Sequence, residues 1–378
     1  MRNKRIKIVL VFLIFAVLAS PFASASNVDD YYKEQLEASG AKELSDYLDE
    51  ETSEYLEKLG CEDIELEKLL DVSPKAVFGL IVEMLKNGIS VPLKGFLSAT
   101  GTVILVSVCS GFFPDDEKSR IVPNIICGSI LLTGIFISAS ESIKAAASAI
   151  ESCSAFEKAL IPVLAAVVTA CGNPTLALTF KGAAFAAAEF ISSFGKNFAL
   201  PLVGISGAIG ITGAMLPTVR LSSIGDMIRK TLTTALASAA SLFTGFLALK
   251  GILSSSADGM VKKGVKLAAN TFIPVIGGAI GEAYSSVLGS LSLLRNTVGF
   301  YAVTVFFLIC IPVVLNLALW VISMRAACAV SDLLDCRICS EILRNIAFIF
   351  SMVNTLLLLC MAVFVISTGL VIAIKTGE

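Results

Sequence analysis

Ionisable side chains inside apolar stretches are the first residues of this sequence to consider for chemistry. Lys181, Glu189 and Glu282 lie in or beside weakly hydrophobic segments that are rich in alanine and glycine. A charge at the centre of a bilayer costs about 3 kcal/mol, so such a side chain should face a bundle interior, a partner or a watery cavity. Alternatively, each residue lies near the interface and extends its charged end to water. The three residues are therefore candidate functional positions.

Nucleophilic catalysis is restricted by the complete absence of histidine from the 378 residues. Ser–His and Cys–His pairs and histidine metal sites are excluded. Gly204-Ile205-Ser206-Gly207 matches the G-x-S-G pattern of rhomboid-type intramembrane proteases, but those enzymes need a histidine base. We therefore interpret Ser206 as a position of close helix packing. The sequence also lacks a G-x-x-x-x-G-K-[ST] phosphate loop, so we predict a protein without enzymatic activity, cofactor or metal.

Ten cysteines are present, and half of them lie inside apolar runs, where a free cysteine behaves as a small hydrophobic residue. Cys336 and Cys339 form a single C-x-x-C motif. One such motif is weak evidence for a metal or redox site. The other interpretation places both residues in an amphipathic helix that links the last two hydrophobic segments.

The elements that position these residues belong to a membrane protein. Hydrophobic residues make up 56% of the chain and charged residues 16%, with a mean hydropathy of +0.84. Soluble domains have about 45–50% apolar and about 25% charged residues, so the bilayer is the solvent for most of this chain. We predict an all-α, polytopic membrane protein. Short basic clusters interleaved with apolar residues give no sign of nucleic-acid binding.

Residues 1–25 have the organisation of a cleavable signal peptide. A basic segment, Met1–Lys7, precedes an apolar run of 11 residues, and Ala23-Ser24-Ala25 follows as a small-x-small cleavage site. An uncleaved anchor is the alternative. Both place the residues from Ser26 onward outside the cytoplasm.

Residues 26–73 form a predicted acidic, helical, extracytoplasmic region. Residues 26–71 contain 16 acidic residues and four lysines, with apolar residues at helical spacing. Gly40 and Gly60 are predicted helix ends. Ser73-Pro74 predicts the N-cap and first residue of a further helix, which lies in the interface or packs on the membrane body. The acidic region is either a solvated surface or a docking element for an extracytoplasmic protein.

Residues 74–378 form the predicted membrane domain, with six to nine hydrophobic segments, some of them re-entrant. The candidate segments are 96–113, 121–140, 156–172, 175–194, 198–217, 231–250, 271–294, 297–323 and 346–374. Helix breaks are predicted at Pro162, Asn173-Pro174, Pro201 and Pro274. Gly277, Gly278 and Gly281, just before Glu282, allow close approach of the backbone.

Two stretches of this domain resemble each other. Residues 137–167 and 252–280 both run from a serine-rich start through a lysine-bearing helix into Ile-Pro-Val. Repeats of broken helices build the central sites of many transporters. Convergence between segments of similar composition is the alternative explanation.

The sequence as a whole resembles the stage III sporulation protein AE family of endospore-forming Firmicutes. The resemblance rests on the signal region 1–25, FEKALIPVLAAV (156–167), NPTLAL (173–178), NTFIPVIGGAIGEAY (270–284) and the last two hydrophobic segments. It covers nearly the whole chain.

This resemblance implies a multi-pass protein of the mother-cell membrane around the forespore, with its N-terminal region extracytoplasmic. It implies membership of a secretion-like channel complex that sustains late forespore gene expression. The implied partners are membrane and intermembrane-space subunits, including a separate ATPase, besides the lipid bilayer. The family offers no catalytic residues. An independent secondary transporter or permease, with a midplane site built from broken helices, is the alternative function.

Overall fold

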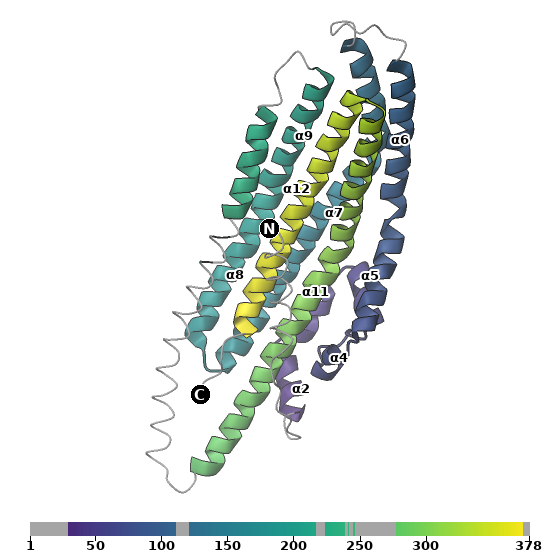
Figure 1. Cartoon of the computed structure of the whole chain (residues 1–378). Helices are drawn as coiled ribbons and strands as arrows, with labels where there is room; N and C mark the ends of the chain where they lie inside the picture. Colours follow the sequence, from purple (N-terminus) through teal and green to yellow (C-terminus); the bar gives the residue numbers. More distant parts are fainter. Residues whose placement is uncertain are drawn as a thin grey trace.

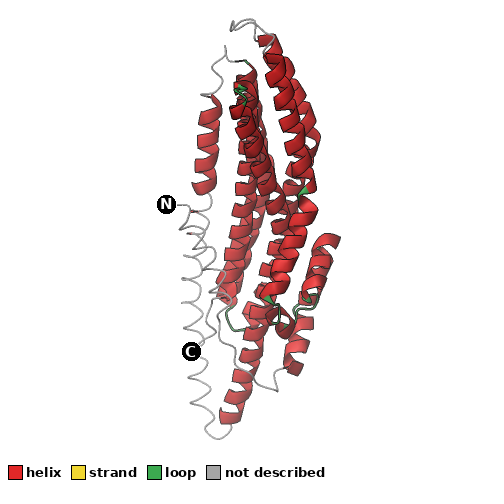
Figure 2. Ribbon diagram, turned by 45° about the vertical axis from the view of Figure 1, so that its right-hand side comes forward, coloured by secondary structure: helices red, strands yellow, loops and turns green. Residues whose placement is uncertain are grey.

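The computed structural model describes residues 29–110, 121–216, 224–238, 241, 245 and 277–372. These residues are mostly helical and contain no strand, which confirms the all-α prediction, and the helices form an elongated bundle (Figures 1 and 2). The predicted signal peptide and Pro274 lie outside the described residues. The second stretch of the possible repeat, residues 252–280, lies almost entirely outside them as well.

The described chain divides into an acidic head, residues 29–73, and a membrane body that begins at Pro74. The head contains α2 (Asp29–Ala38), the 3-10 helix η1 (Ala41–Tyr47), α3 (Glu50–Leu59) and α4 (Leu66–Leu70). The body contains α5 (Pro74–Gly88), α6 (Ser90–Ser110), α7 (Ile121–Ala170), α8 (Pro174–Phe194), the π-helix η2 (Gly195–Ala199), α9 (Leu200–Met215), α11 (Gly277–Leu333) and α12 (Arg337–Ile372). Residues 224–238 form a further helix.

Five helices in the described residues are long and apolar enough to cross a membrane. They are Pro74–Cys109, Ile125–Ala170, Ala177–Met215, Gly289–Leu333 and Arg337–Gly369. The protein is therefore a multi-pass membrane protein. The predicted segment 231–250 lies mostly outside the described residues.

Several segments that the sequence predicts as separate are joined into single helices. Helix α7 contains 121–140 and all of 156–172 except its last two residues, and its 50 residues extend over about 75 Å. The residues between them, 141–155, contain five alanines, four serines, two glutamates and one lysine. The polar residues lower the mean hydropathy, whereas alanine, glutamate and lysine are good helix formers. The low hydropathy of residues 141–155 therefore does not indicate a loop, because these residues are part of α7. Since the hydrocarbon layer is about 30 Å thick, α7 extends well beyond it.

The head has the terminal signals of helices in water, as predicted. Asp49 caps α3 by accepting a hydrogen bond from the Thr52 backbone N–H at 2.8 Å, and Ser73 caps α5 through the Ala76 N–H at 3.1 Å. Gly40 and Gly60 both have positive φ angles at helix boundaries. Pro74 is the first residue of α5, in agreement with the prediction.

The head and α5 pack on α11 near one end of the bundle (Figure 1). Ser290 of α11 donates a hydrogen bond to Gln35 Oε1 of α2 at 3.1 Å. Asn316 of α11 donates to the Gly88 carbonyl at 3.4 Å, where α5 gives way to α6. Helix α5 thus packs on the membrane body, one of the two predicted positions.

Trp320 of α11 joins four helices in the core. Its ring is fully buried, its Nε1 donates to Ser142 Oγ of α7 at 2.8 Å, and it stacks on Phe350 of α12 with ring centroids 4.9 Å apart. The ring also lies against Gly95 of α6, where an added Cβ would come within 2.5 Å of the ring. Helices α6, α7, α11 and α12 are fixed together at this point.

Candidate functional site

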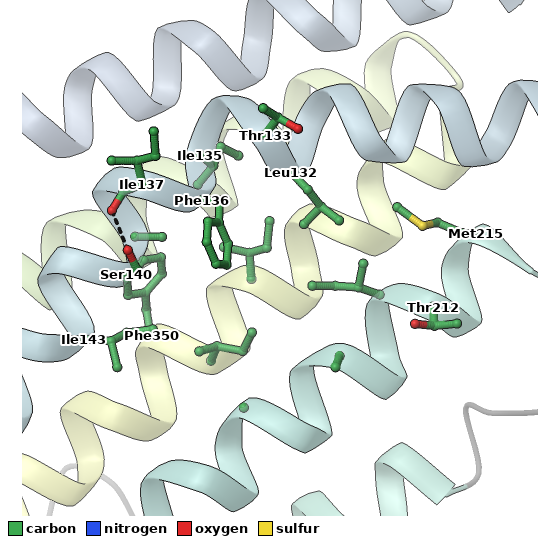
Figure 3. Close-up of a pocket in the computed structure, with 16 residues that line it drawn as sticks. Leu132, Thr133, Ile135, Phe136, Ile137, Ser140, Ile143, Thr212, Met215 and Phe350 are labelled. Atoms are coloured by element: carbon green, nitrogen blue, oxygen red, sulfur yellow. Dashed lines mark hydrogen bonds between the residues drawn. The ribbon is translucent and has the colours of Figure 1, made fainter.

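An apolar groove lies between α7, α9 and α12 (Figure 3). Its volume is about 600 Å³. Leu132, Phe136 and Ile143 of α7 line one side, and Met215 of α9 and Phe350 of α12 line the others. Figure 3 also shows Ser140, whose hydroxyl donates to the Ile137 carbonyl of its own helix at 2.8 Å. The groove carries no ionisable side chain among its lining residues, so it is suited to apolar contact and not to proton or ion chemistry.

The ionisable residues predicted as candidate sites occupy a different face, formed by α7 and α8. Glu189 of α8 forms an ion pair with Lys158 of α7 at 2.7 Å, and both side chains are exposed on the bundle surface. Lys196 of η2 pairs with Glu151 of α7 one step further along the same face. Glu189 therefore faces outward and satisfies its charge with a neighbouring helix instead of facing the bundle interior.

Lys181 and Pro162 come together in a second cavity of about 480 Å³ between α7 and α8. Lys181 is exposed and lines this cavity. Pro162 does not break its helix, contrary to prediction, because α7 continues to Ala170. Proline at this position leaves the Lys158 carbonyl without its intrahelical partner. Packing against neighbouring helices is the general reason why long membrane helices tolerate such a loss.

Asn173 and Pro174 form a sharp turn between α7 and α8. Gly172 adopts a φ of 76°, and the N–H groups of Gly172 and Asn173 donate to the carbonyls of Thr169 and Val168, the pattern of a Schellman motif. Pro174 begins α8. The Asn173 side chain is buried, and its Nδ2 has no hydrogen-bond partner in the described residues.

Pro201 lies in the first turn of α9, directly after the π-helix η2. The chain remains helical from α8 through η2 into α9. The predicted break at Pro201 is therefore a local π-helical distortion before Pro201 and not the end of a helix. Gly277, Gly278 and Gly281 lie in the first turns of α11. The Glu282 side chain lies outside the described features.

The most unusual ionisable residue of the body is Glu157, which the sequence-based choice of candidates missed. Its side chain is 1% exposed, and neither carboxyl oxygen has a hydrogen-bond partner of good geometry in the described residues. Ser367 of α12 is the polar side chain that reaches this carboxyl. Ser367 Oγ is buried and also lacks a well-formed hydrogen bond. Glu157 and Ser367 therefore form an incompletely satisfied polar pair between α7 and α12.

Glu157 lies on a buried stripe of α7 that was available in the sequence. Its buried members recur at intervals of three and four residues: Ala146, Ala149, Ile150, Cys153, Phe156, Glu157, Leu160, Ile161, Leu164, Val167 and Val168. An acidic residue in such a stripe faces the core by helical geometry alone. This periodicity is the signal that would have identified Glu157.

Arg295 of α11 is a second buried charge that the sequence analysis missed. Its side chain is 3% exposed and makes a long hydrogen bond of 3.5 Å to Ser292 Oγ. Its Nε and Nη1 have no partner in the described part of the chain. Arg295 lies near the start of the apolar span Gly289–Leu333, so its buried charge belongs to the membrane body.

Cys336 and Cys339 lie at the turn between α11 and α12. Cys336 precedes the first residue of α12, Cys339 lies in its first turn, and both are buried free thiols. The Cys339 thiol hydrogen bonds to Cys336, and this contact lowers the pKa of Cys336 to about 7. No group of three or more potential ligands for a metal ion occurs in the described residues. The motif is thus a packed thiol pair at a helix start.

Ser206 is fully buried in α9. Its hydroxyl has no hydrogen-bond partner, and hence no general base in contact, among the described residues. The adjacent Gly207 packs directly against Ile349 of α12. Both observations agree with a role in helix packing.

Comparison with known proteins gives two matches. The family model described as stage III sporulation protein AE matches residues 73–375. A curated relative, stage III sporulation protein AE of Bacillus subtilis (strain 168), is 27% identical over 239 residues, which cover 63% of this chain. The aligned residues span 58% of that relative's length. No solved structure matches the chain.

Proposed function

The chain belongs to the stage III sporulation protein AE family, and from this premise we propose that it is a non-enzymatic membrane subunit of a sporulation complex. In this proposal the complex is a secretion-like channel that links the mother cell and the forespore. The protein resides in the mother-cell membrane around the forespore, with its head on the extracytoplasmic side, and is needed for late forespore gene expression.

The observation that carries this proposal is the extent of the family match. Residues 73–375 include all five long apolar helices, from Pro74 to Gly369. The family relationship therefore concerns the whole membrane body. Membership of the family makes this a sporulation protein, and the body makes it a multi-pass membrane protein.

The head supports a role in assembly with other subunits. Its glutamates and aspartates are mostly exposed, and helix caps and packing on α11 hold it in place. A structured acidic surface beside the membrane suits a basic partner in the intermembrane space, since complementary charge steers association. Because the sequence has no phosphate loop, the proposal assigns energy supply to a separate ATPase subunit.

The experiment is deletion of the gene in its sporulating host, followed by a reporter for late forespore transcription after engulfment. We expect transcription to stop after engulfment and to be restored by the wild-type gene. A matched complementation with a chain that has its exposed head carboxylates neutralised tests the docking role of the head. Normal late transcription and normal spore yield in the deletion strain would refute the channel role.

An independent secondary transporter is the second candidate, and buried Glu157 is the observation that favours it. Ionisable residues inside membrane helix bundles are frequent in ion pathways and proton relays. This function predicts substrate or ion flux when the purified chain is reconstituted alone in liposomes. The channel-subunit function predicts none without its partners, so the flux measurement separates the two.

A further inference from the structure

The described residues around Glu157 leave a carboxylate there without a counter-charge. The neighbouring Lys158 points to the outer face of α7 and is paired with Glu189 of α8. On the inner side, the titratable groups are the thiols of Cys153 on α7, Cys310 on α11 and Cys360 on α12. Cys153 Sγ and Cys310 Sγ lie 3.4 Å apart. None of these groups is positively charged, and Ser367 contributes only a hydroxyl.

The surrounding packing also excludes water from the carboxyl. Phe156, the preceding residue, meets Phe306 of α11 edge-to-face with centroids 5.3 Å apart. Phe306 in turn stacks on Phe364 of α12 at 5.3 Å. All three rings are fully buried. A buried charge without a partner is strongly unfavourable, whereas a neutral carboxyl needs only one hydrogen-bond acceptor.

We propose that Glu157 is a proton-binding site in the membrane body and that its proton holds α7 against α12. In the bound state the neutral carboxyl donates a hydrogen bond to Ser367 Oγ after a small side-chain adjustment. When the O–H bond breaks, the electron pair stays on the carboxylate and the proton passes to water. The resulting charge must be hydrated, and the packing of Phe156 of α7 and Phe364 of α12 on Phe306 of α11 has to open to admit that water.

The bound ligand is a proton and not a metal ion. Hard cations such as calcium require six or more oxygen ligands. The groups around Glu157 in the described structure are one carboxyl, the Ser367 hydroxyl and thiols, and no metal-binding group is found in the described residues. The inference concerns the membrane body alone and is independent of the proposed channel role.

Infrared spectroscopy of the full-length protein in lipid nanodiscs provides the direct test. Subtracting the spectrum of Glu157→Gln from that of the wild type at neutral pH should leave the C=O stretch of a protonated carboxyl, which shifts in D₂O. Glu151→Gln is the matched control, because Glu151 is an exposed glutamate of the same helix that is ion-paired with Lys196. Its subtraction should leave only carboxylate bands. Carboxylate bands in the Glu157→Gln subtraction would overturn the proposal.

Ser367→Ala keeps the test decisive if Glu157→Gln does not fold. Removal of the hydroxyl acceptor should move the same protonated-carboxyl band to higher frequency, as expected for a carboxyl that loses its hydrogen bond.

Thermal unfolding provides a second test, because release of the proton should weaken the contact between the helices. Raising the pH should lower the thermal unfolding midpoint of the wild type by several degrees more than that of Glu157→Gln. Equal pH dependence of the two proteins would show that no proton at Glu157 holds the helices together. Neither result depends on sporulation, so failure here leaves the channel role to be judged by the deletion experiment.

Discussion

The acidic head and the membrane body differ in the exposure and pairing of their charged side chains. In the head, charges are exposed and form short surface pairs such as Lys42–Glu37 at 2.6 Å and Lys58–Glu54 at 2.9 Å. In the body, Glu157 and Arg295 are almost fully buried, and some of their polar atoms have no partner in the described residues. Surface pairs contribute little to stability, whereas unsatisfied buried groups are costly. A costly group that persists is the better indicator of function.

The two regions also differ in what holds their helices. The short helices of the head depend on caps and on αL glycines at their ends. The long helices of the body depend on interhelical packing, concentrated where Trp320 meets α6, α7 and α12. Substitutions should therefore lower the stability most where four helices meet and least at single hydrogen bonds in the head.

Trp320→Ala should produce the largest loss of stability. The substitution removes a fully buried ring together with its hydrogen bond to Ser142 and its stack on Phe350. Replacing a buried large aromatic residue by alanine costs about 3–5 kcal/mol. Thermal unfolding of the purified protein in detergent measures this loss. Leu97→Ala on α6 is the control, because Leu97 is 61% exposed and should have a much smaller effect. A similar loss in both variants would show that Trp320 is not the packing centre.

Gly95→Ala should destabilise the same contact from the α6 side. The added Cβ would meet the rigid indole ring of Trp320 at 2.5 Å, so the ring or the helix has to move. Overpacking of this kind costs about 1–3 kcal/mol. Gly101→Ala is the matched control on the same helix, since nothing lies within 4 Å of its added Cβ. The difference between the two unfolding midpoints gives the result, and a Gly95→Ala protein as stable as Gly101→Ala would contradict the close contact.

The elements of the fold were largely predictable, but their lengths were not. Ser73-Pro74, Gly40, Gly60 and Asn173-Pro174 mark boundaries because their chemistry acts within one turn of helix. The continuity of α7 through Pro162 depends on packing by other helices, which local sequence does not encode. Hydropathy windows also divided α7, because they treat exposed lysine and glutamate as loop signals.

The candidate site was predictable only in part, for a geometric reason. Glu157 and Lys158 are adjacent in sequence, yet about 100° of helical rotation places one in the core and the other at the surface. A search for charges in apolar segments selects Glu189, which faces outward and is paired. The interval pattern of α7 distinguishes the two faces. The partner Ser367, more than 200 residues away, required the structure.

Within the head, loss of the α3 cap tests whether short helices depend on their ends. Asp49→Ala removes the acceptor for the Thr52 N–H, which lies 2.8 Å from Asp49 Oδ1. Such a substitution costs about 1 kcal/mol. Hydrogen exchange of residues 50–59 in the full-length protein should become faster, while exchange in α12 stays unchanged. Ser53→Ala, at an exposed position of the same helix, is the control and should leave the exchange rate nearly unaltered. Slower or unchanged exchange in Asp49→Ala would argue against the cap.

Tyr32→Phe should have a small effect at neutral pH and the clearest dependence on pH. The Tyr32 hydroxyl donates to the Ile64 carbonyl at 2.8 Å and thereby ties α2 to the segment before α4. Its removal should cost about 0.5–1.5 kcal/mol, the net worth of a typical intramolecular hydrogen bond. Burial raises the pKa of Tyr32 above its ordinary value near 10. The folded head therefore favours the neutral phenol, and this contribution is complete below pH 10 and declines as the pH rises through the folded-state pKa. Above pH 10, hydrogen exchange of α2 in the wild type should accelerate more than in Tyr32→Phe, since only the wild type has a phenol to ionise. Parallel acceleration in both proteins would mean that Tyr32 is not held neutral by its surroundings.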